Sequence, residues 1–148
     1  MSKPKVLFLC AHNAARSQMA EALLRKHAGD RFEVVSAGLE PTVIHPLTIR
    51  ALNEVGVDVS GHRAKGLDQF LGKATFQLAI IVCERTQEDC PHIYPFALQR
   101  LHWPFEDPVE CNRAEEEQIQ KFRDVRDQIE ARILEWLKNP TVAVQATA

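Results

Sequence analysis

Two short apolar runs constrain the fold more than any other feature of the chain: VLFLC at 6–10 and LAIIV at 78–82. A strand with one face in water alternates apolar and polar residues, whereas these runs are apolar on both faces. Both are shorter than a typical buried helix, so each indicates a strand that is covered on both sides. Such strands belong to parallel sheets whose faces pack against helices. We therefore expect the chain to fold around a parallel sheet.

Helical patterns alternate with strands along the sequence. Strands are expected at 5–9, 32–37, 78–82 and 99–102, and helices at 17–28, 46–55 and 113–138, with a short helix at 67–71. The last helix carries an apolar stripe of Ile119, Phe122, Val125, Ile129, Ile133, Leu134 and Leu137. The sequence therefore predicts a single α/β domain over 1–148. Its central parallel four-stranded sheet is flanked by helices in three layers, and 139–148 form a frayed tail.

Composition excludes several classes of protein. The 148 residues suit one domain, and the net charge of −2 gives no field that attracts nucleic acid or an anionic membrane. No apolar run is long enough to span a bilayer. We expect a monomeric, cytoplasmic protein with no nucleic-acid or membrane partner. In that compartment the four cysteines do not suit a structural disulfide framework, which leaves catalysis, metal binding or simple burial for Cys10, Cys83, Cys90 and Cys111.

The loop after the first strand combines a thiol with an arginine. Cys10 ends the strand, and Arg16 and Ser17 open the following helix. Ligands of open α/β sheets bind at the carboxyl ends of the strands, where loop N–H groups and a helix N-terminus attract anions. The same environment favours a thiolate, so Cys10 is expected to be a nucleophile. The planar guanidinium of Arg16 suits two oxygens of a tetrahedral oxyanion.

The substrate-binding loop is predicted to comprise the residues from the nucleophile's neighbour to the first helical turn: Ala11, His12, Asn13, Ala14, Ala15, Arg16 and Ser17. The small alanines let the loop close tightly, and Ser17 is expected either to hydrogen-bond the thiolate or to cap the helix. A buried cysteine beside a surface arginine is the bland alternative. The position of the motif between the first strand and the first helix favours the functional interpretation.

A displacement at phosphorus or arsenic also needs an acid that protonates the leaving oxygen. In FEDPVE, Asp107 precedes a proline that restricts its backbone, and Glu106 is the neighbouring candidate. On chemistry alone the two carboxyl groups cannot be told apart, and an Asp that merely starts a turn is the alternative.

Several motifs together resemble a known family. CAHNAARS at 10–17, SAGLEP at 36–41, GVDVSGHRAKGL at 56–67 and DP at 107–108 are similar to the low-molecular-weight protein tyrosine phosphatases. VCERTQEDCPHIYP at 82–95, followed by HWPFEDP, resembles the thioredoxin-coupled arsenate reductase branch of that family. The resemblance runs from about residue 5 to about residue 137. It implies a role in arsenical resistance and detoxification, and it favours Asp107 as the general acid.

The resemblance implies a relay of three thiols. Cys83 follows the LAIIV strand and so lies at the same sheet edge as Cys10, while Cys90 is in the long connection that follows. If Cys10 forms an arsenate adduct, attack by Cys83 releases arsenite and leaves a Cys10–Cys83 disulfide. Attack by Cys90 then carries the disulfide outward. No bound cofactor is expected, and an external dithiol such as thioredoxin is required, with a glutaredoxin or a small thiol as alternatives.

Three other functions remain as alternatives. In a phosphatase, water would hydrolyse a phospho-Cys10. A non-catalytic oxyanion-binding module is disfavoured because nucleophile, arginine and acid are all present. A zinc site formed by Cys83, Cys90, His92 and Cys111 lacks the usual short spacings between ligands.

The resemblance also implies a remnant of a cation site. Asn13, Glu21 and Ser36 match positions that hold potassium in some thioredoxin-coupled reductases, but the fourth position, acidic in those relatives, is Lys65. We expect the ammonium of Lys65 to replace the cation and no metal to be bound. His12 stands where many members of the family have glycine. Its side chain either faces the substrate or alters the shape of the loop, and the sequence does not decide between the two. His62, His102 and Trp103 are expected to be structural.

Overall fold

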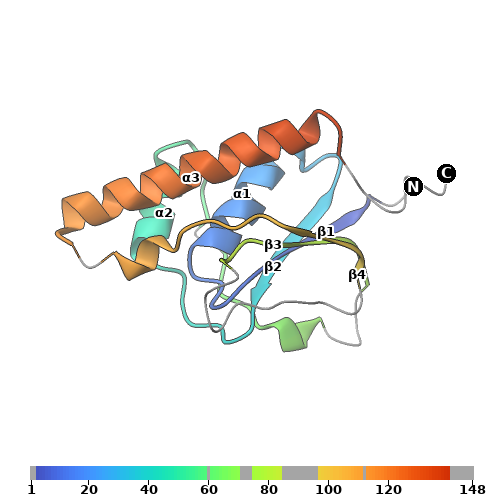
Figure 1. Cartoon of the computed structure of the whole chain (residues 1–148), viewed down its shortest axis with the longest axis horizontal. Coiled ribbons are helices and arrows are strands. Elements are labelled where there is room, and N and C mark those ends of the chain that lie inside the picture. Colours follow the sequence, from blue (N-terminus) through green and yellow to red (C-terminus); the bar gives the residue numbers. More distant parts are fainter. Residues whose placement is uncertain (1–2, 60, 71–74, 85–96, 112, 141–148) are drawn as a thin grey trace.

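The four strands form one parallel sheet (Figure 1). They are β1 (Lys5–Cys10), β2 (Glu33–Gly38), β3 (Phe76–Ile81) and β4 (Ala97–His102), in the order β2-β1-β3-β4. The structure is a computed structural model that describes residues 3–59, 61–70, 75–84, 97–111 and 113–140. β1 and β3 are the interior strands, because their unbroken apolar runs suit burial on both faces. The predicted four-stranded parallel sheet is confirmed.

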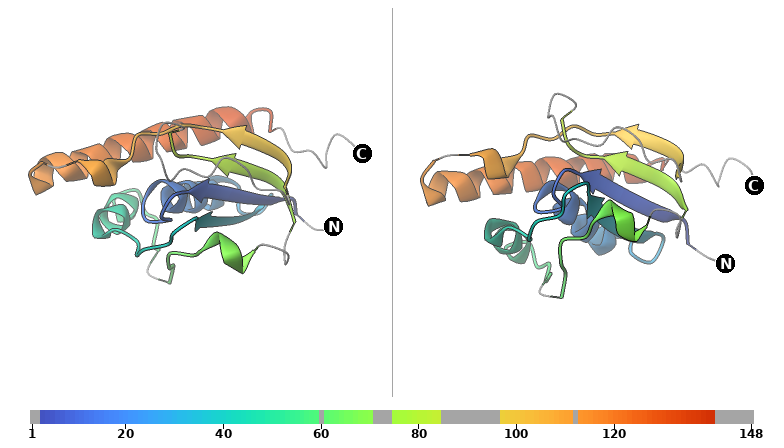
Figure 2. Two further views of the ribbon diagram at one scale, coloured as in Figure 1. Left: turned by 60° about the horizontal axis from the view of Figure 1, so that its bottom comes forward. Right: turned by 90° about the horizontal axis from the view of Figure 1, so that it is seen from below.

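In the described ranges, three α-helices and two short 3₁₀ turns accompany the sheet. They are α1 (Arg16–Ala28), α2 (Pro46–Asn53) and α3 (Glu115–Leu137), with η1 (Leu67–Gln69) and η2 (Pro108–Glu110). α1 and α3 pack side by side against one face of the sheet, and η1 lies on the other side (Figure 2). The third layer is therefore represented by η1 in the described part of the chain. η2, a single turn begun by a proline, was not predicted from the sequence.

The apolar stripe of α3 is shifted from the predicted one at its carboxyl end. Leu134 is 44% exposed, so its place in the stripe was wrong. Trp136 is buried instead, with its ring centroid 5.3 Å from that of Phe32 and 6.1 Å from that of Trp103. The buried residues of α3 recur every three or four positions, so Trp136 follows Ile133 on the buried face of the helix. Leu134 lies on another face.

The sheet brings its catalytic candidates to one edge. Cys10 is the last residue of β1, and the backbone N–H of Val82, just beyond β3, donates to the Leu9 carbonyl at 2.9 Å. The N–H of Phe105 donates to the Val82 carbonyl at 3.2 Å, so the chain after β4 continues along the same edge. No helix in the described ranges is both long and apolar enough to cross a membrane. Most of the predicted frayed tail, 141–148, lies outside the described residues.

Candidate active site

The loop from Cys10 to Ala15 is held by a neighbouring segment, residues 39–45. Backbone hydrogen bonds of 2.9 to 3.3 Å join the carbonyl oxygens of Cys10, Ala11, His12 and Ala14 to the N–H groups of Leu39, Glu40, Thr42 and His45, respectively. In a trans peptide the N–H points opposite to the carbonyl. The N–H groups that follow these carbonyls are therefore turned away from segment 39–45 and toward the interior of the loop. This arrangement suits the anion-binding cradle predicted from the sequence.

Gly38 allows the loop to approach β2. A Cβ atom at this position would lie 2.8 Å from Ala11 O, from Asn13 N and from His12 C, which are all backbone atoms of the loop. Real Cβ contacts do not come this close to backbone, so any side chain here would push the loop outward. The sequence feature behind this requirement is the glycine of SAGLEP.

Asn13 fixes the strained point of the loop. Its φ of 56° is in the left-handed region, which Asn tolerates better than most residues. Its fully buried amide uses both donors and accepts twice. Nδ2 donates to Ser17 Oγ at 2.7 Å and Ser36 Oγ at 2.9 Å, while Oδ1 accepts from Gln18 Nε2 and the Lys65 backbone N–H, both at 2.8 Å. A side chain satisfied on every side holds the unusual backbone conformation in place.

The sulfur of Cys10 receives hydrogen bonds from two directions. The backbone N–H of Asn13 donates to Sγ at 3.2 Å, and Ser17 Oγ lies 2.9 Å from Sγ. Because Ser17 Oγ already accepts from the Asn13 amide, its single hydroxyl hydrogen is available to donate to the sulfur. Two donors therefore converge on the Cys10 sulfur. Of the two roles expected for Ser17, the structure shows the hydrogen bond to Cys10; the residue that precedes the helix is Ala15, so capping by Ser17 was wrong.

Arg16 and Asp107 meet above the loop. Arg16 Nη2 lies 3.3 Å from Asp107 Oδ2, and Nη1 donates to the Phe105 carbonyl at 3.1 Å. The second carboxylate oxygen of Asp107 accepts from the backbone N–H of Val109 at 3.0 Å. Glu106 points elsewhere: it is 60% exposed and pairs with Lys121 at 2.6 Å. The structure therefore distinguishes the two carboxyl groups that chemistry alone left open, and of the two only Asp107, which the resemblance favours, reaches the arginine.

Behind the loop, a buried carboxylate anchors the network. Glu21, only 2% exposed, accepts from Ser36 Oγ at 2.6 Å and pairs with Arg25 at 3.1 Å. Lys65 Nζ lies 3.4 Å from Glu21 Oε1, and His62 Nδ1 lies 3.9 Å from Glu21 Oε2. The four residues predicted as a cation-site remnant are thus brought together, with an ammonium among them. Glu21 is not an exposed helix residue, which was the bland alternative.

A pocket of about 230 Å³ opens over the loop. Its walls are formed by Cys10, His12, Ala14, Ala15, Arg16, Thr42, Asp107, Val109 and Glu110. The Nδ1 atom of His12, one of these lining residues, lies 3.0 Å from the Glu40 carbonyl. Because a carbonyl only accepts, Nδ1 is the donor in this contact. Nucleophile, arginine and acid therefore share one small pocket with the loop.

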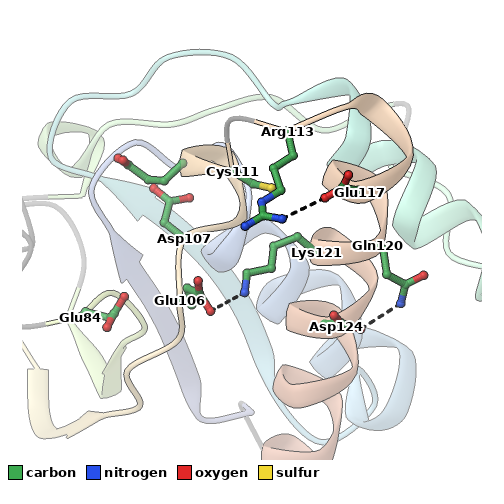
Figure 3. Close-up of a pocket in the computed structure, with 10 residues that line it drawn as sticks. Glu84, Glu106, Asp107, Cys111, Arg113, Glu117, Gln120, Lys121 and Asp124 are labelled. Atoms are coloured by element: carbon green, nitrogen blue, oxygen red, sulfur yellow. Dashed lines mark hydrogen bonds and ion pairs between the residues drawn. The ribbon is translucent and has the colours of Figure 1, made fainter.

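A larger groove of about 690 Å³ borders this pocket (Figure 3). It runs along the amino-terminal half of α3 and shares Asp107 and Glu110 with the smaller pocket. Acidic side chains dominate it, and its two cations are engaged: Lys121 with Glu106, and Arg113 with Glu117 at 3.2 Å. Because the groove lacks Cys10 and Arg16, we assign the chemistry to the smaller pocket.

The other cysteines differ in their surroundings. Cys83 is fully buried and is in a disulfide, whereas Cys10 and Cys111 are free. Cys111 lines the acidic groove. Cys90 and His92 lie outside the described residues. Among the residues that the structure does describe, no three His, Cys, Asp or Glu side chains form a group that could hold a metal ion.

Three further residues contribute to the site and were missed from the sequence: Gln18, Phe105 and His45. Gln18 braces Asn13, and Phe105 holds Arg16 through its carbonyl. His45 caps α2. Burial lowers the pKa of His45, while the carboxylate of Asp107 acts in the opposite direction and raises it. Only the HP dipeptide at a helix start could have indicated His45.

Fold and site together define a class: a parallel α/β domain with a cysteine-and-arginine oxyanion loop at the carboxyl edge of its sheet. The family of low-molecular-weight phosphotyrosine protein phosphatases matches residues 5–146, and the chain belongs to that family. The family that the sequence resembles is thereby confirmed.

Arsenate reductases are prominent among the similar proteins. The chain is 39% identical to the arsenate reductase of Halalkalibacterium halodurans over 134 residues, which is 90% of this chain and 94% of the relative. It is 36% identical to the arsenate reductase of Bacillus subtilis over 137 residues, covering 92% and 96% of the two chains. An arsenate reductase solved in the phosphate-binding state superposes with a TM-score of 0.75 at 27% identity, covering 93% of this chain and 99% of that one.

A second similar structure is that of an arsenate reductase named as thioredoxin-dependent. The thioredoxin-dependent arsenate reductase of Corynebacterium glutamicum is 35% identical, with a TM-score of 0.68. The match covers 99% of this chain and 64% of that one.

Proposed function

We propose that the protein is an arsenate reductase that converts arsenate to arsenite with three of its own thiols. The observation that carries the proposal is the neighbourhood of Cys10 and Cys83: their strands, β1 and β3, are paired in the sheet and end at the same edge. A phosphatase has no need for a second thiol beside its nucleophile. The names of the similar proteins support the same function.

The first step is capture of the oxyanion. Arg16 and the inward N–H groups of the loop bind arsenate, and the thiolate of Cys10 attacks arsenic. The carboxylate of Asp107, which lines the same pocket, takes a proton from one hydroxyl of dihydrogen arsenate and passes it to another, and that oxygen leaves as water. The product is a covalent adduct between arsenic and the Cys10 sulfur, with arsenic still in its oxidised state.

The second step is the reduction. The thiolate of Cys83 attacks the sulfur of Cys10, a Cys10–Cys83 disulfide forms, and the electron pair of the sulfur–arsenic bond goes to arsenic. Arsenite leaves, two electrons having passed from two thiols to arsenic. Cys90 then attacks Cys83, which frees Cys10 and leaves a Cys83–Cys90 disulfide for an external dithiol. The disulfide state of Cys83 is compatible with this last intermediate.

We further propose that thioredoxin is the dithiol and that the enzyme works as a cytoplasmic monomer without a bound cofactor. The thioredoxin-dependent name of the Corynebacterium glutamicum protein supports the reductant. A glutaredoxin or a small thiol would give turnover without thioredoxin, so omitting each reductant in turn identifies the donor.

Lys65 is proposed to replace a potassium ion. Its ammonium lies 3.4 Å from Glu21 Oε1, close enough to neutralise a buried carboxylate that otherwise has Arg25 as its nearest cation. The network from Glu21 through Ser36 and Asn13 to the nucleophile loop then needs no metal ion.

The proposal is tested by the arsenite formed from arsenate in the presence of thioredoxin, thioredoxin reductase and NADPH. We expect turnover by the wild type and none by Cys10→Ser. The alternative, a phosphatase, is supported if the wild type forms no arsenite but hydrolyses an aryl phosphate, and if Cys83→Ser and Cys90→Ser hydrolyse it equally well.

A further inference from the structure

The start of α2 is attached to the oxyanion loop at one atom, the carbonyl oxygen of Ala14. The backbone N–H of His45 donates to this oxygen at 3.0 Å, and Thr48 Oγ1 donates to it at 2.9 Å. Ala14 and Ala15 both line the oxyanion pocket. The direction of the Ala14 carbonyl fixes the direction of the next N–H, because the two belong to one planar peptide. The first turn of α2 therefore orients an N–H group of the cradle.

The side chain of His45 holds that first turn together. Its Nδ1 accepts the backbone N–H of Leu47 at 3.1 Å, while Pro46 at the first helical position has no N–H to satisfy. An imidazole that accepts through Nδ1 must carry its proton on Nε2 and be neutral. Asn, Asp, Ser and Thr are the usual residues in this role, and their capping oxygens do not depend on a neutral ring.

The imidazole is also enclosed by other parts of the site. Its ring packs against Phe122 of α3, with the centroids 4.9 Å apart. Asp107, on the segment after β4, is the charged group that acts electrostatically on the imidazole. The neighbouring Phe122 and Ala14 carry no charge. Burial lowers the pKa of His45 more than Asp107 raises it, which favours the neutral ring that the cap requires at neutral pH.

We propose that His45 is a positioning residue of the oxyanion pocket: by capping α2 through Nδ1 it fixes the hydrogen bonds that orient the Ala14–Ala15 peptide toward the substrate. This role rests on the proposed oxyanion pocket at Cys10 but not on the reduction of arsenate. Protonation at Nδ1 removes the acceptor of the cap. Oxyanion affinity is therefore expected to weaken on acidification, beyond the weakening caused by titration of the oxyanion itself.

The test uses inorganic phosphate as the probe and alkylation of Cys10 by iodoacetamide in the reduced protein as the readout. Phosphate in the pocket protects Cys10, so the phosphate concentration that halves the alkylation rate gives its affinity. His45→Ala is expected to weaken phosphate about fivefold at pH 7.5, the factor that corresponds to one lost cap. His45→Asn supplies an amide oxygen to Leu47 and should stay within about twofold of the wild type.

The pH dependence separates positioning from mere helix stability. As the pH is lowered from 7.5 to below the ordinary histidine pKa of 6.5, the affinity of the wild type should fall relative to that of His45→Asn, because only the wild-type cap titrates. Glu54→Gln, which loosens the other end of α2 without touching Ala14, serves as the control and should leave phosphate affinity unchanged. If His45→Ala lowers the melting temperature but binds phosphate as the wild type does, the proposal is wrong. If phosphate does not protect even the wild type, the oxyanion pocket itself is wrong, and the proposal falls with it.

Discussion

Arg16 and Asp107 form an ion pair inside the pocket, with Nη2 and Oδ2 3.3 Å apart and the side chains only 3% and 13% exposed. The arginine that is to bind the oxyanion is thus oriented by the acid that is to protonate the leaving oxygen. An entering oxyanion shares the guanidinium with Asp107, and the backbone carbonyl of Phe105 keeps the guanidinium in place from the other side. Substitution of Arg16 and substitution of Asp107 should therefore test oxyanion binding and protonation of the leaving oxygen separately.

Arg16→Lys should impair binding and chemistry together. A lysine places one point charge where the guanidinium supplies a planar fork, so kcat/KM for arsenate is expected to fall about a hundredfold.

Asp107→Asn should instead lower kcat by about 10²- to 10⁴-fold while phosphate still binds. Steady-state kinetics and phosphate protection of Cys10 measure the two effects. Equal losses of phosphate affinity in both variants would contradict the separate roles.

Ser17→Ala should lower the reactivity of Cys10 while the oxyanion pocket keeps its shape. The variant loses the hydroxyl that lies 2.9 Å from the Cys10 sulfur, while the Asn13 N–H remains. Loss of one donor to a charged acceptor, worth about 1.5–3 kcal/mol, is expected to reduce the rate of Cys10 alkylation at neutral pH about tenfold or more. Ser17→Thr keeps a hydroxyl and is the matched control. Unchanged alkylation in Ser17→Ala would show that the hydroxyl does not support the thiolate.

Gly38→Ala should damage the oxyanion loop. The added methyl would stand 2.8 Å from three backbone atoms, and relief of such overpacking costs about 1–3 kcal/mol in the free energy of unfolding. Phosphate protection of Cys10 is expected to weaken with it. Gly61→Ala, where an added Cβ meets nothing within 4 Å, is the control for a glycine-to-alanine change. Denaturant unfolding and alkylation measure both effects, and an active, stable Gly38→Ala would contradict the tight approach.

Potassium should not stimulate the wild type. Since Lys65 already places an ammonium 3.4 Å from Glu21, exchanging sodium for potassium at constant ionic strength is expected to leave kcat/KM unchanged. Lys65→Asp removes the ammonium and supplies an acidic side chain, so turnover of this variant should rise with potassium. Strong and specific potassium stimulation of the wild type would reject the replacement.

Glu54 should stabilise the attachment of α2 to α3 in a pH-dependent way. Hydrogen bonds from Arg123, and then Arg126, lower the pKa of Glu54 from 4.5 to about 2. A carboxyl group whose folded pKa is lowered stabilises the fold above its unfolded pKa and loses that contribution as the pH falls through the folded one. Glu54→Gln is expected to cost about 1 kcal/mol at pH 7, and the difference should shrink as the pH falls from about 4.5 to about 2. A difference independent of pH would contradict this origin.

Hydrophobic patterning was sufficient to predict the sheet. The unbroken runs that end at Cys10 and Val82 are interior strands, as two buried faces require. The predicted stripe of α3 was wrong at its carboxyl end, where Trp136 is buried in place of Leu134. The chemistry of the residues alone did not choose between Glu106 and Asp107, which are adjacent, and the choice of Asp107 came from the family resemblance. The path of the chain after β4 turns Asp107 inward and leaves Glu106 exposed.

The missed residues act through geometry that the sequence does not encode locally. His45 is distant in sequence from Ala14 and Phe122, and its role depends on both. The buried state of Glu21 likewise depends on Ser36 of β2 and on His62 and Lys65 of the loop before η1. Patterns within one segment predict elements, whereas a site assembled from several segments needs the fold.

The most direct test of the thiol relay is a single turnover of fully reduced enzyme with arsenate and no external reductant. We predict one arsenite released per chain together with the loss of two thiols, by the wild type and also by Cys90→Ser, which retains Cys10 and Cys83. Cys83→Ser should release no arsenite, because no neighbouring thiol can attack the Cys10 adduct. Arsenite release by Cys83→Ser equal to that of the wild type, or no arsenite from any of the three proteins, would contradict the account.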